Sequence, residues 1–443
     1  MVRVGFCKQD LADALPENYT MLEERIEAVA MWLEETNGNA ALWMVLDFMD
    51  FDLSTVRALQ TAAAAQVQLP IEHIHVLTTH NHGGGAPNVE RLAELCAECA
   101  GKAKENARPV QMRYAFVQAD EQMSFIRRKY VPELERKITL YYGSSQKEGY
   151  NAAPFVEHAV QTTRNGQLKY VGRAETNRPA EPFMPADPEI MILQFQQPDG
   201  TPVGSVLRFA AHATCANVPG CFTSDFPWHV RQGLEKQFGG TALFFNGPCG
   251  EIAPGVAEKG DGSHKILGEY LVSLAMKAAE RVVFESVRQF ADTTVQIPLP
   301  VRTEVKENQV AIPETMPEDL PNRRRYLEKD YLSKFLPFLR EKAVENGEIG
   351  ESVTVELGFL QLNGLTLAGF PGETFHATAQ AVKNAFPERD ICTLTEHDRT
   401  VMYIPPVEEY ALGGYESVCM TTAPGAEEIL REKAIGVLEQ FLL

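Results

Sequence analysis

Three consecutive segments decide the fold class of this chain: ALWMVLDF (residues 41–48), LSTVRALQTAAAAQVQ (residues 53–68) and IEHIHVLTT (residues 71–79). The first and third are short apolar runs bounded by polar residues, a pattern typical of buried strands. The middle segment has helical periodicity. A strand, a helix and a second strand in succession indicate an α/β protein.

The same alternation continues towards both ends of the chain. We expect further strands at 188–195, 203–211, 241–246 and 365–370, and helices at 21–38, 88–105, 226–238, 264–282 and 373–386. The order of these elements is mixed, which favours a mixed β-sheet core flanked by helices. The charged stretch 313–350, with its expected helix, is the one plausible internal boundary. We therefore treat residues 1–443 as a single domain.

Composition excludes several classes of partner. The chain of 443 residues carries 41 Lys and Arg against 60 Asp and Glu, a net charge of −19. An acidic surface repels nucleic acid and anionic membranes, so neither is expected as a stable partner. The first twenty residues lack the apolar stretch of a signal peptide. We expect a cytoplasmic protein that acts on a small molecule, either as a monomer or as a homo-oligomer.

The cysteines fit a reducing compartment. Eight cysteines are scattered along the chain, which predicts free thiols and not a disulfide framework. Cys96 and Cys99 form a CxxC, but the pair lies in a helical segment and no second CxxC completes a zinc site. We interpret these two cysteines as helix packing residues.

Residues that can bind metal cluster at predicted strand ends. His80 and His82 follow the strand that ends at Thr79, and His212 follows the strand at 203–211. Glu373 follows the strand at 365–370, where we expect it in the first turn of a helix, and Tyr403 precedes a Pro-Pro turn. Functional groups gather at the carboxyl ends of strands in α/β sheets.

Two histidines and a glutamate are a donor set that binds zinc and leaves room for water. His80, His212 and Glu373 form one such set. The residues alone do not fix this assignment, because other histidines and acids offer the same donor atoms. These rivals are His82, Asp225, Glu251, His376 and His397.

Several motifs resemble the neutral ceramidases and their bacterial relatives, in the same order along the chain. TTHNHGGG (78–85) and RFAAHATC (208–215) resemble the two histidine segments of that family. The segment from SDFPW (224–228) to GEIAPG (250–255) resembles its helix, strand and loop. FPGETF (370–375), YIPPVEEYALGGYE (403–416) and TNRPAE (176–181) resemble three further motifs. The resemblance extends from about Val4 to the C-terminus.

This resemblance implies a ceramidase-like hydrolase with one zinc ion per chain. The implied metal ligands are His80, His212, Glu373 and Tyr403, and the implied substrate-orienting residues are His82 and Arg178. A supporting or substrate-binding role is implied or expected for Asp47, Asn177, Asp225, Asn246 and Arg399. Zinc would lower the pKa of water towards roughly 7 for attack on an amide carbonyl.

The sequence also departs from the family. Ala253 replaces a loop serine, and Glu396, His397, Asp398 and Arg399 replace an Asn-Gly that usually precedes the tyrosine motif. We expect no counterpart of that family's immunoglobulin-like C-terminal domain. These differences predict a small polar substrate in place of ceramide, and an acidic one such as an N-acyl amino acid if Arg178 and Arg399 face the metal.

Three alternatives remain at the sequence level. Cys249 or Cys215 could supply a thiol nucleophile in place of the missing serine. The HxH motif also opens the metal motif of metallo-β-lactamases, although glycines stand where that family has an Asp-His pair. Finally, the chain could be a non-catalytic metal-binding protein, which Ala253 would favour.

Overall fold

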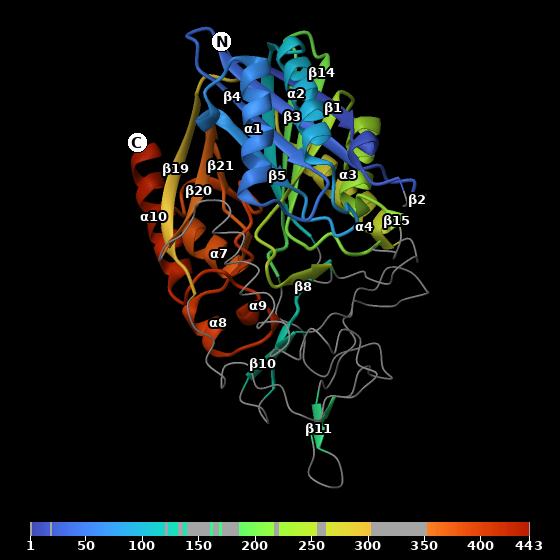
Figure 1. Cartoon of the computed structure of the whole chain (residues 1–443). Coiled ribbons are helices and arrows are strands. Elements are labelled where there is room, and N and C mark those ends of the chain that lie inside the picture. Colours follow the sequence, from blue (N-terminus) through green and yellow to red (C-terminus); the bar gives the residue numbers. More distant parts are fainter. Residues whose placement is uncertain are drawn as a thin grey trace.

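The computed structural model describes residues 2–17, 20–119, 123–131, 136–139, 160–162, 168–170, 186–216, 221–254, 263–302 and 352–442. Within them lie three large sheets with helices on their outer faces (Figure 1). The predicted mixed α/β class is therefore confirmed. The charged stretch 313–350 and the predicted site residues Asn177 and Arg178 lie outside the described residues.

The first sheet is N-terminal and has the strand order β5-β4-β3-β1-β6. Its strands are β1 (Val2–Asp10), β3 (Glu27–Glu35), β4 (Ala40–Leu46), β5 (Ile74–Thr78) and β6 (Arg108–Pro109). Strands β3 and β4 are antiparallel, and α1 (Leu53–Val67) then leads to β5, which is parallel to β4. The short helices η1 (Ala12–Ala14) and η2 (Ile71–His73) lie in its connections, and α2 (Val89–Glu105) follows β5.

The second sheet repeats this arrangement with the order β16-β14-β13-β7-β18. Its strands are β7 (Gln111–Gln118), β13 (Glu189–Gln196), β14 (Pro202–Phe209), β16 (Thr241–Asn246) and β18 (Glu285–Ser286). Strands β13 and β14 are antiparallel, and α3 (Asp225–Gln237) leads to β16, which is parallel to β14. Helix α4 (Ser263–Ala279) packs beside α3.

The third sheet has the order β19-β20-β21-β23. Its strands are β19 (Phe290–Pro300), β20 (Ser352–Leu362), β21 (Leu365–Gly369) and β23 (Asp390–Leu394). Strands β20 and β21 are antiparallel, and α7 (His376–Ala385) leads to β23, which is parallel to β21. The C-terminal helix α10 (Ala426–Phe441) packs against α7 and β19.

Short strand pairs and helices complete the described structure. The pairs are β2 (Thr20–Met21) with β15 (Cys221–Phe222), β8 (Ser124–Ile126) with β17 (Ile252–Pro254), β9 (Arg128–Val131) with β10 (Arg136–Thr139), β11 (Val160–Thr162) with β12 (Leu168–Tyr170), and β22 (Glu373–Thr374) with β24 (Tyr403–Ile404). Helices α8 (Val407–Ala411) and α9 (Tyr415–Val418) follow β24.

Hydrophobic packing joins the three sheets around one central core. Trp43, Phe195, Phe245 and Leu367 come from all three sheets and belong to one buried cluster. Separate apolar clusters lie under the helices on each sheet, with α1 and α2 side by side over the first (Figure 1). Burial of apolar area on both faces of each sheet is the main source of stability for this arrangement.

The three sheets share an antiparallel pair followed by a helix and a parallel strand: β3-β4-α1-β5, β13-β14-α3-β16 and β20-β21-α7-β23. The second strand of each unit leads to Asp47, His212 and Glu373 respectively. The third strands lead to His80, Asn246 and Glu396. Equivalent strand ends in three sheets thus supply the polar residues of one region.

Two secondary-structure predictions are wrong. Residues 21–38 were expected to be a helix, but residues 27–35 form β3, which lies between β1 and β4 with Ala28–Leu33 buried. A strand buried on both faces has no alternation of apolar and polar residues. Together with the glutamates on either side, this sequence therefore resembles that of a helix. Glu373 lies in β22 and not in a helical turn, because α7 begins only at His376.

Candidate metal centre

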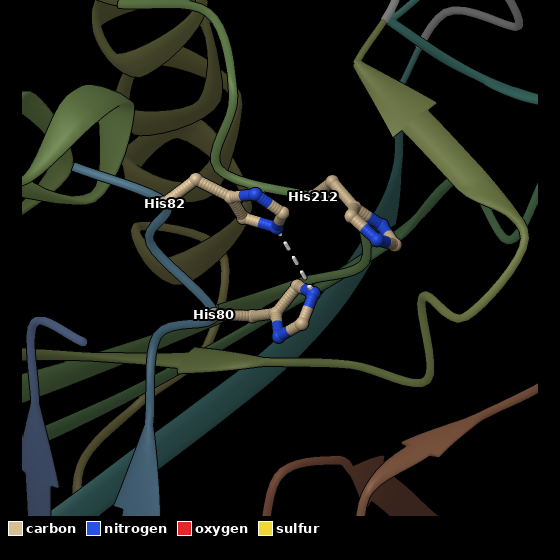
Figure 2. Close-up of side chains that lie close together, drawn as sticks. All are labelled: His80, His82 and His212. Atoms are coloured by element: carbon tan, nitrogen blue, oxygen red, sulfur yellow. Dashed lines mark hydrogen bonds between the residues drawn. The ribbon is translucent and has the colours of Figure 1, made fainter. Parts of the chain in front are cut away.

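Three imidazoles converge where the first and second sheets meet (Figure 2). His80 and His82 follow β5, and His212 follows β14. Ring centroids are 4.5 Å apart for His80 and His212, and 5.0 Å apart for His80 and His82. The His80 and His82 Nε2 atoms are 3.4 Å apart. One nitrogen from each of the three rings lies within 4.8 Å of the others, as metal ligation requires.

Glu373 brings a carboxylate from the third sheet to the same point. Its Oε2 lies 3.1 Å from His212 Nε2 and 3.2 Å from His80 Nε2. Strand β22 pairs in parallel with β24, so Glu373 is directly opposite Tyr403. We call His80, His82, His212 and Glu373 the strand-end cluster.

Backbone carbonyls fix the orientation of two imidazoles. His212 Nδ1 lies 2.9 Å from the carbonyl oxygen of Ile252, and His80 Nδ1 lies 3.1 Å from that of Met49. A carbonyl only accepts, so Nδ1 carries the proton in both rings. Each Nε2 then directs its lone pair into the cluster when the ring is neutral, as in metal-binding histidines.

The charges of the cluster suit a cation. Burial lowers the pKa of His212 to about 4, and burial together with the neighbouring histidines holds the pKa of His82 well below its usual range. Burial opposes ionisation of Glu373, but His80 and His212 lower its pKa below the usual range. Neutral imidazoles and an ionised carboxylate are the protonation states that ligation needs.

The protonation of His80 indicates that the cluster needs a positive charge. Burial would lower its pKa, but the carboxylates of Glu373 and Glu396 raise it well above the usual value. A proton on His80 therefore balances the buried anions in the metal-free chain. A divalent cation at this point would provide that positive charge, so the donor set and its electrostatics both fit a metal ion.

Arg127 is a residue of this region that sequence reasoning missed. Its Nη2 donates to Tyr403 Oη at 2.9 Å and to the carbonyl of Gly250 at 3.0 Å, while its Nε donates to Glu416 at 2.8 Å. Burial, followed by the charge of Glu373, raises the pKa of Tyr403 well above its usual value. The sequence feature that could have pointed to Arg127 is the pair of adjacent arginines in SFIRRKY (124–130).

Asn246 and Asp47 position the loops that carry the histidines. Asn246 Nδ2 donates to the carbonyls of Thr79, at 3.1 Å, and Ala211, at 3.0 Å, so it links the two histidine loops. The Asp47 carboxylate accepts two hydrogen bonds from Arg231, at 2.8 and 2.6 Å, and its carbonyl accepts one from Asn81 at 3.2 Å. The Asn246 side chain thus braces the backbone next to both histidines, whereas Asp47 reaches the His80 loop through its own carbonyl and by accepting from the Thr79 hydroxyl at 3.3 Å.

The rival donors make pairs of their own. Asp225 accepts from the amides of Ala216 and Phe226, and Glu251 pairs with His376. His397 Nε2 lies 2.9 Å from His75 Nδ1. Of the rivals, His82 alone is brought next to His80 and His212.

The four charged residues at 396–399 separate into different environments. Glu396 Oε1 lies 3.2 Å from His80 Nδ1, and burial raises the pKa of Glu396 to about 7. Asp398 is buried, and its pKa is raised to about 7 by burial and by the charge of Glu356, with Arg399 and Arg57 opposing the shift. Glu396 is thus the member of this group that faces the strand-end cluster.

The Cys249 thiol does not suit nucleophilic attack. Burial, and then the charges of Glu396 and Glu373, raises the pKa of Cys249 well above its usual value, so this thiol stays protonated. Cys96 and Cys99 are buried in α2, where burial raises the pKa of Cys96 to about 12. Ala253 lies in β17, opposite Phe125 of β8.

No family model and no curated protein matches this sequence. Solved structures do match its fold. A "Ceramidase complexed with C2" superposes with a TM-score of 0.69 at 15% identity, covering 100% of this chain and 76% of the other. A "neutral ceramidase from Pseudomonas aeruginosa" superposes with a TM-score of 0.67 at 15% identity, covering 99% of this chain and 75% of the other. The chain therefore has a ceramidase-like fold.

Proposed function

We propose that this protein is a zinc-dependent hydrolase that cleaves an amide or related bond in a small polar substrate. The observation that carries the proposal is the convergence of His80 Nε2, His212 Nε2 and Glu373 Oε2, with the two Nδ1 atoms held by carbonyls. Hydrolytic zinc sites are built from such a set and keep one position open.

Each residue in and beside the strand-end cluster has its own proposed role. His80, His212 and Glu373 would hold the ion, with Tyr403 completing the set from the adjacent strand. A bound zinc ion supplies Lewis acidity, which polarises a carbonyl and acidifies water. His82 lies beside His80, and burial keeps its ring neutral, so it can orient the substrate through a hydrogen bond. Arg127 holds the Tyr403 hydroxyl and places a positive charge beside it.

A polar substrate follows from the groups around the cluster. Arg127 and Glu396 are buried beside Tyr403 and His80, so charged groups surround the cluster. Polar surroundings of this kind favour a polar substrate over an acyl chain. Among the described residues, no helix is long and apolar enough to cross a membrane.

The whole-chain likeness to ceramidases favours this proposal over a metallo-β-lactamase-like hydrolase. The test is zinc analysis of the purified protein together with a panel of amides and esters. Matched amides with and without a carboxylate would be assayed on the parent and on Arg178→Ala and Arg399→Ala. We expect bound zinc, turnover of small amides, and poor turnover of ceramide.

Zinc bound without turnover of any panel member would indicate the non-catalytic alternative. Equal turnover of charged and uncharged amides, or unchanged preference in both arginine variants, would reject the acidic substrate. Robust ceramide turnover would reject the small polar substrate.

A further inference from the structure

A second group of two histidines and one glutamate lies outside the strand-end cluster. His229 belongs to α3, His264 to the first turn of α4, and Glu24 to the segment between β2 and β3. The Nε2 atoms of both histidines lie 2.9 Å from the same carboxylate oxygen, Glu24 Oε1. The two rings are 5.0 Å apart. We call these three residues the helix-pair cluster.

The donors of this cluster are withdrawn from water. Glu24 is 4% exposed and His229 is 8% exposed, while the His264 side chain is 14% exposed. Two imidazole nitrogens and one carboxylate oxygen therefore meet in a place largely shielded from water.

We propose that the helix-pair cluster binds a second divalent transition-metal ion, of which zinc is the best match. Two imidazole nitrogens and one carboxylate oxygen are a common protein ligand set for zinc and related ions. Their ligand atoms lie within 4.8 Å of one another, as do the three imidazole nitrogens of the strand-end cluster. In both places, two Nε2 atoms approach one carboxylate oxygen.

The connections of Glu24 indicate a structural role for this ion. The hydroxyl of Thr223 donates to Glu24 Oε2 at 3.3 Å, which orients the carboxylate. The backbone of Thr223 accepts from Asn81 Nδ2 at 2.6 Å and donates to the carbonyl of Gly83 at 3.2 Å. An ion here would tie α3, α4 and the N-terminal segment together beneath the loop that carries His80 and His82.

The test measures zinc bound per chain after chelation and reconstitution, by equilibrium dialysis with elemental analysis. We expect about two equivalents for the parent and about one for His264→Ala and for Glu24→Gln, since each change removes a ligand. Glu24→Gln preserves side-chain volume and therefore serves if His264→Ala fails to fold. The matched control is His73→Ala, a half-exposed histidine bound to Asp292, which should keep about two.

A fourth variant separates this proposal from the proposed function. His80→Ala/His212→Ala removes the strand-end ligands and should retain about one equivalent of zinc at the helix-pair cluster. Unchanged stoichiometry in both Glu24→Gln and His264→Ala would show a hydrogen-bonded cluster without metal and overturn the inference. Loss of all zinc from His80→Ala/His212→Ala would overturn it as well.

Discussion

The strand-end cluster and the helix-pair cluster have similar donors but different surroundings. The first is assembled from all three sheets and is bordered by Tyr403, Arg127 and Glu396. The second joins two helices and a loop, with Thr223 supporting its carboxylate. A ligand set alone therefore does not identify a catalytic site. The two clusters differ in the polar groups that border them.

Positive φ angles occur near both clusters, because Asp225 at the start of α3 has a φ of 58°, but more of them surround the strand-end cluster. His80, Glu396, Asp398 and Met402 all adopt positive φ angles, at 54°, 55°, 65° and 61°. Such conformations are strained for residues other than glycine and collect at functional sites. These four residues lie in the loops that form or border the strand-end cluster. Strained backbone and buried acids lower the stability of this region, a combination that is common at functional sites.

The largest expected effect is loss of an imidazole from the strand-end cluster. His212→Ala should lower kcat/KM by more than about 100-fold and should remove one equivalent of zinc. This loss is larger than that expected for a residue that only hydrogen-bonds to a metal ligand. Steady-state assays and metal analysis on the same preparations provide the measurement. His73→Ala is the control, and a similar loss in that variant would mean that the effect is not specific.

The next effect tests the border of the strand-end cluster. Tyr403→Phe removes the hydroxyl that accepts from Arg127 but keeps the ring, so hydrolysis should fall by about 10–100-fold while most zinc remains bound. Tyr114→Phe removes a hydroxyl bound to Asp390 and should leave kcat/KM within about twofold of the parent. Full activity in Tyr403→Phe would show that the Tyr403 hydroxyl has no role in hydrolysis and that the residue serves only in packing.

A smaller effect concerns stability and pH. Burial and Glu356 raise the pKa of Asp398 from 3.8 to about 7, so the folded state binds its proton more tightly than the unfolded state does. The contribution of Asp398 to stability should therefore fall as pH rises from about 4 to about 7, by at most about 1.4 kcal/mol per pH unit. The Asp398→Asn variant has no ionisable group at this position. The difference in stability between this variant and the parent should therefore favour the variant more at pH 8 than at pH 5.

Urea unfolding at several pH values measures this difference. The exposed Asp13→Asn is the matched control and should follow the pH profile of the parent. If Asp398→Asn also followed that profile, the buried acid would contribute nothing to the pH dependence of stability.

The smallest effect on catalysis should come from the helix-pair cluster. His264→Ala should keep kcat/KM within about threefold of the parent but lower the melting temperature by several degrees, because the ion braces the fold. Thermal unfolding with and without a chelator provides the measurement. Chelation should lower Tm less in His264→Ala than in the parent. A loss of activity in His264→Ala as large as that in His212→Ala would show that the two clusters do not differ in their role in catalysis.

The sequence placed three members of the strand-end cluster after apolar strands, and the resemblance to ceramidases singled them out from the rival donors. His80, His212 and Glu373 each come after a short buried strand, a local pattern that a single sequence displays. The central strand β3 was predicted as a helix, since burial on both faces removed the alternation that marks a strand.

Other residues could not be found in this way. Arg127, Glu24 and His264 are distant in sequence from the partners that they meet, and they lie in segments without a strand-end signal. Their roles depend on how the sheets and helices pack. The three equivalent strand–helix–strand units likewise became visible only in the sheet topology.

The most direct test of the metal centre is anomalous diffraction at the zinc edge from crystals of the zinc-loaded protein. We expect an anomalous peak within ligating distance of His80 Nε2, His212 Nε2 and Glu373 Oε2, at about 2.0–2.2 Å from each. Density consistent with water at that point and no anomalous peak, in a protein that retains its hydrolytic activity, would contradict it.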